Sequence, residues 1–134
     1  MDRFRSFLSS NVEYVYAILR IVAGFMFALH GVQKLFHLWL PPGVELDTQA
    51  YIGGVIELVA GVMIALGAGT RYAAFIASGE MAVAYIQFHW RFHFDSRLLP
   101  IVNHGDDTLL YAFLFLFIAC RGAGMWSVDR ERGQ

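Results

Sequence analysis

Several side chains that can carry charge or exchange protons lie inside stretches of the sequence that are otherwise apolar. Glu57 and Glu80 are carboxylates set among small residues, and His30, Gln33 and Lys34 lie close together at the end of an earlier apolar stretch. An ionisable group costs on the order of 2.5–3.5 kcal/mol at the centre of a membrane helix, so it usually faces the interior of a helical bundle. These residues therefore predict buried ion pairs or a polar pocket that exchanges protons.

The depth of each group follows from the rise of about 1.5 Å per helical residue. Glu57 and His30 are then expected roughly 10 Å below one membrane surface, Glu80 near the midplane, and Arg20 roughly 10 Å from the other surface. Two interpretations stay open. Arg20 can pair with Glu80 as a charge-compensated structural pair, and Glu57 can pair with His30 or Lys34. The same groups can instead line a functional pocket.

The histidines suggest a second kind of site. His89 and His93 are four residues apart and share a helical face if the helix continues through Trp90. Such a pair can hold a metal ion or contact the edge of a haem. Three aspartates of the following loop could complete a site, and they are Asp95, Asp106 and Asp107. The same residues are equally compatible with an interfacial histidine pair, a helix cap and ordinary solvated acids.

Long apolar segments must position all of these groups. Of the 134 residues, 57% are apolar and 16% are charged, and the mean hydropathy is +0.51. A soluble domain of this size needs more charge to cover its surface, so the composition indicates a lipid environment. A spanning helix takes about 20 residues. We therefore expect one transmembrane domain over 1–134 with spans at 14–36, 50–68, 71–90 and 108–121.

The connections and flanking charges predict how the spans are arranged. One tight turn and two loops of roughly 13 to 17 residues favour an all-α, polytopic membrane four-helix bundle with up-down-up-down topology. Six arginines flank the spans on the side of the N-terminus, namely Arg3, Arg5, Arg71, Arg121, Arg130 and Arg132. The other side holds three basic residues, namely Lys34, Arg91 and Arg97. This excess predicts that both termini are cytoplasmic. The net charge of −1 gives no indication of a nucleic-acid partner.

Short motifs follow one another along residues 14–129 in an order that is specific when they are taken together. They are Leu19-Arg20-Ile21 with Gly24, His30-Gly31-Val32-Gln33-Lys34-Leu35, Ile56-Glu57-Leu58 with Gly61, Leu66-Gly67, Thr70-Arg71-Tyr72-Ala73-Ala74, and Gly122-Ala123-Gly124-Met125-Trp126-Ser127-Val128-Asp129. In this order they resemble the DoxX family of small bacterial membrane proteins. The resemblance implies a four-helix protein of the bacterial cytoplasmic (inner) membrane, with the lipid bilayer as its first partner.

The resemblance also implies a direction for function. Some members of the family are subunits of a thiosulfate:quinone oxidoreductase, and others are linked to redox stress or to membrane complexes that handle thiols. We therefore expect a subunit of a quinone-linked redox complex whose polar pocket opens to the extracytoplasmic side. A membrane or periplasmic redox partner protein would deliver electrons there. Whether the chain is itself a quinone-dependent enzyme stays open.

Each polar residue has an expected role if quinone is the cofactor. Glu57, Glu80 and His30 are the catalytic candidates, because quinone reduction takes up two protons with two electrons. The residues expected to bind the quinone are Arg20, Gln33 and Lys34, and His30 could also hydrogen-bond a quinone carbonyl. Metal or haem at His89 and His93 is a weaker expectation.

Two alternatives remain beside the redox subunit. The chain could be a non-enzymatic scaffold whose acidic, histidine-bearing outer loop docks a soluble redox partner. It could instead be a small-molecule or lipid transporter that uses the same polar pocket. Four helices leave little room for alternating access, so the transporter would require a homo-oligomer.

Overall fold

The computed structural model describes residues 1–133, and within that range the regular structure is entirely helical. The long helices are α2 (Val12–Phe36), α3 (Thr48–Leu66), α4 (Thr70–Ala84) and α6 (Asp106–Arg121). The short elements are α1 (Asp2–Ser10), a π-helical turn (Tyr85–Trp90), a 3-10 turn (Ser96–Leu98), α5 (Pro100–Asn103) and α7 (Val128–Glu131).

The long helices lie where apolar segments were expected. Their starts at 12, 48, 70 and 106 compare with predicted starts at 14, 50, 71 and 108. Within the described range, α2 and α3 are long and apolar enough to cross a membrane. The α-helical part of α4 is shorter because the chain widens into the π-helical turn at Tyr85 before it ends at Trp90.

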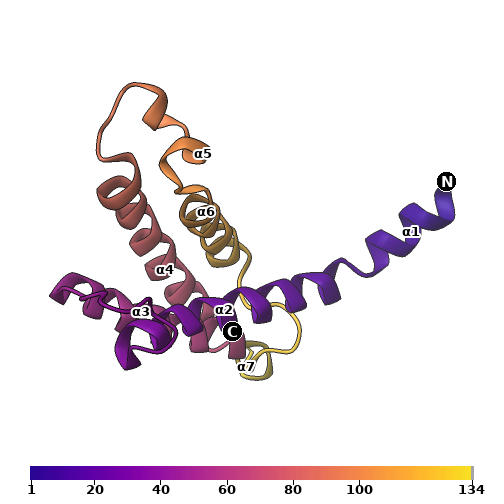
Figure 1. Cartoon of the computed structure of the whole chain (residues 1–134). Coiled ribbons are helices and arrows are strands. Elements are labelled where there is room, and N and C mark those ends of the chain that lie inside the picture. Colours follow the sequence, from indigo (N-terminus) through magenta and orange to yellow (C-terminus); the bar gives the residue numbers. More distant parts are fainter. Residues whose placement is uncertain (134) are drawn as a thin grey trace.

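The long helices pack as two pairs. The α2–α3 contact is the most extensive, the α4–α6 contact is second, and α3 meets α4 over a smaller area. In Figure 1, α4 and α6 run side by side and diverge from α2 and α3. The two pairs are joined by the tight turn at Gly67–Gly69, where both glycines have positive φ. Residues of all four long helices line a cavity between the pairs.

Glycines allow α2 and α3 to approach to backbone contact. A Cβ atom added at Gly24 of α2 would lie 2.5 Å from the amide nitrogen of Ala65, and one added at Gly61 of α3 would lie 2.5 Å from that of Ala28. No real side chain tolerates such a distance, so these positions must lack one. Small residues of this kind let helices pack closely in lipid.

The C-terminal segment folds back onto the turn between the helix pairs. The Asp129 carboxylate accepts hydrogen bonds from the amides of Gly69 (2.7 Å) and Thr70 (2.9 Å) and from the Thr70 hydroxyl (2.8 Å). It thereby caps the N-terminus of α4 from outside that helix. Burial raises the pKa of Asp129, but the hydrogen bonds from Thr70 and Gly69 outweigh burial, and the pKa lies below its usual value.

Large apolar side chains cover the outside of the helices as well as the core. Phe27, Ile64, Phe115 and Ile118 are fully buried. More than half exposed are Ile18 and Phe25 of α2, Val55 and Val59 of α3, Phe75 and Ile76 of α4, and Leu110, Phe113 and Phe117 of α6. A soluble monomer rarely exposes apolar surface on this scale. Lipid is the solvent that suits these faces.

Candidate functional site

The space between the two helix pairs is a cavity of about 750 Å³. Its volume falls in the range of small-molecule sites, roughly 300–1,000 Å³. Apolar side chains form most of its wall, including Phe27, Ile56, Phe88 and Met81. Ile52, Phe75 and Ile76 also line it and are more than half exposed. The cavity therefore opens toward the lipid-facing surface beside α3 and α4.

An ion pair between α2 and α3 lies at the polar end of the cavity. Lys34 Nζ donates to Glu57 Oε1 at 2.6 Å. Glu57 is only 3% exposed, and its second oxygen, Oε2, has no hydrogen-bond partner in the described part of the chain. Of the two expected partners of Glu57, the structure selects Lys34 as the ion-pair partner. A buried carboxylate oxygen without a donor is costly unless a ligand or a proton satisfies it.

Glu80 brings a second carboxyl group to the same place from α4. Its Oε2 atom is buried and makes no hydrogen bond to any of residues 1–133. A Cβ atom added at Gly53 would lie 2.9 Å from Glu80 Oε1 and 3.9 Å from Lys34 Nζ. The missing side chain of Gly53 thus provides the room in which Glu80 and Lys34 approach each other. Three helices therefore bring one ammonium group close to two carboxyl groups, that of the buried Glu57 and that of the partly buried Glu80.

His30 and Tyr111 add polar groups with an aromatic surface. Their rings meet edge to face with centroids 6.4 Å apart, and both line the cavity. Tyr111 belongs to α6 and also stacks on Phe115. Tyr111 is not among the residues expected from the sequence, because a tyrosine in an apolar helix is unremarkable until the neighbouring helix is known. The signal that could have found it is its position one turn after Asp107.

Arg20 lies away from this cluster. Its guanidinium is completely buried and donates to the carbonyl oxygens of Ile64 (2.6 Å), Ala65 (2.7 Å), Met125 (3.1 Å) and Trp126 (2.7 Å). It therefore ties the end of α3 to the C-terminal segment rather than pairing with Glu80. The physical reason is distance, since Arg20 precedes Lys34 by roughly 20 Å along α2. Arg20 does not line the cavity, and its expected role in quinone binding stays a prediction without support from the geometry.

Gln33 also points elsewhere. Its side-chain amide donates to the carbonyl oxygen of Trp39 at 3.3 Å, and it is not part of the cavity wall. Adjacent helical residues differ by about 100° in direction, so Gln33 and Lys34 cannot face the same space. The three neighbouring residues that were predicted to act together on α2 therefore have two different roles. His30 and Lys34 face the cavity, and Gln33 fixes the chain after α2.

The structure separates His89 from His93. His89 lines the cavity, and its ring nitrogens lie 3.2 Å from the Asn103 carbonyl oxygen and 3.2 Å from the Thr108 hydroxyl. The helix ends between the two histidines, because Arg91 adopts a left-handed conformation with φ of 51°. Among residues 1–133, no group of three or more His, Cys, Asp or Glu side chains lies close enough to hold a metal ion. The metal site at this pair stays a prediction.

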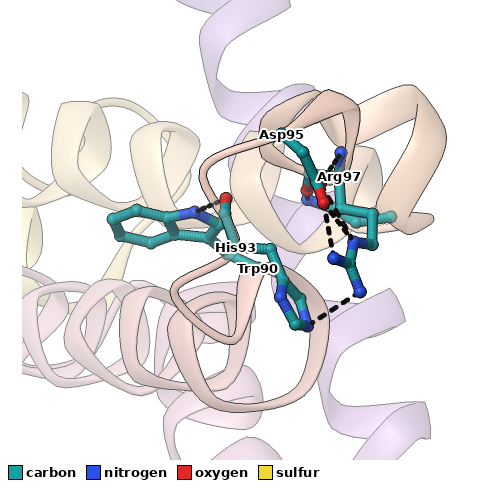
Figure 2. A network of polar contacts seen from close by, with 5 residues as sticks. Trp90, His93, Asp95 and Arg97 are labelled. Carbon is teal, nitrogen blue, oxygen red and sulfur yellow. Dashed lines mark hydrogen bonds and ion pairs between the residues drawn. The ribbon is translucent and has the colours of Figure 1, made fainter.

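His93 belongs to a separate network in the loop after the π-helical turn (Figure 2). Its carbonyl oxygen accepts from the Trp90 indole at 2.8 Å, and its ring lies 3.4 Å from the Arg97 guanidinium. Arg97 also forms a two-pronged pair with Asp95. The side-chain hydrogen bond from Arg97 holds the pKa of Asp95 well below its usual range. This loop is internally bonded and exposed to solvent.

Comparison with known proteins gives the family. The sequence pattern of the family described as DoxX matches residues 15–90. The chain belongs to the DoxX family. A protein of Haemophilus influenzae (strain Rd) that is described as uncharacterized is 39% identical over 122 residues, which cover 88% of this chain and 90% of that protein. No solved structure matches the chain. Family membership and the apolar helices together make this a DoxX membrane protein.

The matched range includes the polar cluster of this DoxX protein. Residues 15–90 contain Lys34, Glu57 and Glu80. They also contain His30 and Gly53, whose missing side chain leaves room for Glu80 and Lys34. Because the Haemophilus influenzae relative is described as uncharacterized, the cavity is the feature that indicates a function for this chain.

Proposed function

We propose that this DoxX protein is the membrane subunit of a quinone-linked redox complex that oxidises thiols or thiosulfate, and that its cavity binds the quinone headgroup. One observation carries the proposal. Two carboxyl groups, each with a buried oxygen that lacks a donor among the described residues, meet one ammonium group at the end of an apolar cavity that opens toward lipid. Quinone reduction requires this combination, because a lipophilic ring must reach groups that hold its oxygens and supply protons.

The shape of the cavity supports a quinone as ligand. Its volume of about 750 Å³ accommodates a substituted ring and the first part of an isoprenoid tail. The tail leaves past Ile52, Phe75 and Ile76 into the bilayer. At the other end, Lys34 and His30 donate to the quinone oxygens, and Tyr111 packs beside the ring. Dispersion and apolar burial then bind the ligand, and the few polar groups orient it.

The proton balance assigns roles to the carboxyl groups. Reduction of a quinone to a quinol takes two electrons and two protons, and oxidation of two thiols to a disulfide releases the same numbers. The electrons come from the partner that oxidises the thiol. Glu80, which has no ion pair among the described residues, delivers one proton to the near oxygen. The ammonium group of Lys34, held in place by the Glu57 carboxylate, delivers the second proton directly or through His30. Both reload through the polar end of the cavity, where His89, Asp107 and Thr108 lie.

The proposal includes the topology of an up-down-up-down four-helix bundle in the bacterial inner membrane, with both termini cytoplasmic. The end of α2, the start of α3, the end of the π-helical turn and the start of α6 are then extracytoplasmic. The positive-inside count supports this orientation. The polar end of the cavity is lined by residues from these ends, including Lys34, Gln49, His89 and Asp107. A periplasmic donor can therefore approach it.

Quinone content and turnover of the purified full-length protein test the proposal. The protein is extracted with organic solvent, and the extract is analysed for quinone by mass spectrometry. Quinone reduction is then followed with the partner complex in nanodiscs. We expect quinone to co-purify, and we expect Glu80→Gln and Glu57→Gln each to lower turnover by about 100-fold. Asp95→Asn is the matched control, because this carboxylate lies outside the cavity, and its turnover should be unchanged.

Two results would reject the proposal. One is a protein that neither carries nor binds quinone, which would favour the scaffold. The other is full quinone turnover in both glutamine variants. A smaller loss of turnover in Lys34→Met than in Glu80→Gln would keep quinone as the ligand and assign Lys34 to binding rather than to proton delivery.

A further inference from the structure

The N-terminal helix α1 has an apolar face that no other part of the described chain covers. Phe4, Phe7 and Leu8 are 67%, 63% and 51% exposed, and α1 has no buried residue. These positions are spaced three and four apart, so they share one side of the helix. Figure 1 shows α1 standing clear of the other helices.

The polar residues of α1 also lie on defined sides of the helix. At 100° per residue, the side opposite the apolar face carries small or acidic residues, namely Asp2, Ser6, Ser9 and Ser10. Arg3 and Arg5 fall between the two faces, one on each flank of the apolar stripe. Long arginine side chains at such flanks can lay their methylenes on lipid and extend the guanidinium to the headgroups.

The position of α1 in the chain decides which surface it can meet. The side chain of Asn11 donates to the Phe7 carbonyl oxygen at 2.7 Å, and Ser10 donates to the same oxygen at 2.9 Å. These bonds end α1, and α2 begins at the next residue, Val12. Because α2 is one of the two candidate spans, the C-terminal end of α1 adjoins a membrane surface. A free helix of this length is marginal in water, so a surface must stabilise it.

We propose that α1 lies in the plane of the membrane and binds an anionic phospholipid surface. Phe4, Phe7 and Leu8 insert at the boundary of the acyl chains, and Arg3 and Arg5 contact lipid phosphates. Asp2 and the serines face water. Covalent attachment through Asn11 gives α1 a high effective concentration at the surface, so a few apolar side chains and two charges are enough. The inference does not depend on the ligand of the cavity.

Site-directed labels on the full-length protein test this placement. In a Cys120→Ser background, an environment-sensitive fluorophore is attached at Phe7→Cys or, as the matched control, at Ser6→Cys. The protein is placed in vesicles containing phosphatidylglycerol and a lipid-borne spin quencher. We expect blue-shifted emission and strong quenching by the lipid label at position 7, and solvent-like emission with quenching by aqueous iodide at position 6.

Charge variants test the contact with anionic headgroups. Each arginine near an anionic surface contributes about fivefold to binding, so Arg3→Gln with Arg5→Gln should lower the bound-to-free ratio of α1 by roughly 25-fold. Vesicles of phosphatidylcholine alone should have the same effect on the unaltered protein. The pair Arg130→Gln and Arg132→Gln removes equal charge outside α1 and should leave the signal at position 7 unchanged.

Three outcomes would overturn the proposal. Equal exposure of positions 6 and 7 to iodide would show that α1 stays in water. Shielding of position 7 from iodide without quenching by the lipid label would show that protein, such as a second copy of the chain, covers the face. Quenching that is the same in both lipids and in the arginine variants would exclude the anionic contact.

Discussion

Buried charged side chains serve two different purposes in this protein. Arg20 is completely buried, and four carbonyl oxygens accept from its two terminal nitrogens, while its Nε has no partner in the described part of the chain. Asp129 is similarly satisfied by amides and a hydroxyl. Glu57 and Glu80 instead each keep a buried oxygen without a donor among the residues described. Arg20 and Asp129 hold segments of the fold together, whereas Glu57 and Glu80 line the cavity with carboxyl oxygens that lack a donor, and this indicates the functional site.

Removing the carboxylate of Asp129 should destabilise the protein in a pH-dependent way. Asp129→Ala should lower the free energy of unfolding by about 1–2 kcal/mol near neutral pH, because α4 loses its cap. The pKa of Asp129 is lowered in the folded protein. Its stabilisation is therefore fully present above the unfolded pKa of about 3.9 and is lost as the pH falls through the lower folded pKa.

Thermal melting in detergent between about pH 7 and about pH 3 measures this loss. The gap in melting temperature between the unaltered protein and Asp129→Asn should narrow as the pH falls below about 4. Asp2→Asn is the control, since Asp2 is exposed on the isolated helix α1. A gap that stays constant over the whole pH range would contradict the role of the ionised carboxylate.

At the scale of the helices, glycine positions determine how α2 meets α3. The Cβ distances at Gly24 and Gly61 require direct contact of the two backbones. Gly53 works differently, because the space it leaves is occupied by the ends of Glu80 and Lys34 rather than by backbone. Close packing at one level of α3 and an opening at another are thus produced by the same residue type. The number of small residues in α3 does not reveal this division.

Alanine substitution should separate the packing glycines from the rest. Gly24→Ala and Gly61→Ala should each lower the free energy of unfolding by about 1–3 kcal/mol, because the added methyl group forces the helices apart. Gly79→Ala is the matched control in α4, where an added Cβ meets no atom within 4 Å. It should be neutral or stabilising by about 0.5–1 kcal/mol, since alanine favours a helix interior over glycine.

Unfolding titrations of the three variants in one detergent provide the comparison. Equal stability of Gly24→Ala, Gly61→Ala and Gly79→Ala would contradict the backbone contact of α2 with α3.

At the scale of the whole molecule, the divergence of two helix pairs creates the cavity. Each pair packs closely within itself, and the pairs are held together at the Gly67–Gly69 turn, where Arg20 and Asp129 bind. The opposite end is thereby free to open around Lys34, Glu57 and Glu80. The orientation of this opening in the membrane decides which compartment would supply protons to the proposed quinone site.

Reporter fusions should establish the orientation. We expect a fluorescent protein fused after the C-terminus to fold and fluoresce in the cytoplasm, and alkaline phosphatase inserted after Val44 to be active outside. The reason is the excess of arginine flanking the spans on the side of the termini. The reverse insertion, with the fluorescent protein after Val44, serves as the control and should be dark. Phosphatase activity from the C-terminal fusion would invert the topology and turn the polar end of the cavity toward the cytoplasm.

The sequence alone determined the helical segments and the residues that must avoid lipid. Long apolar stretches predict helices from local composition, and the cost of a charge in lipid requires Glu57, Glu80 and Lys34 to face protein. Only the tertiary structure decided how these groups combine. Helix rotation and crossing place Lys34 beside Glu57 and Glu80 and direct Gln33 away from the cavity. They also place the Arg20 guanidinium against carbonyl oxygens far along the chain and Tyr111 beside His30. These outcomes depend on contacts between segments far apart in the chain, which the local pattern of residues does not encode.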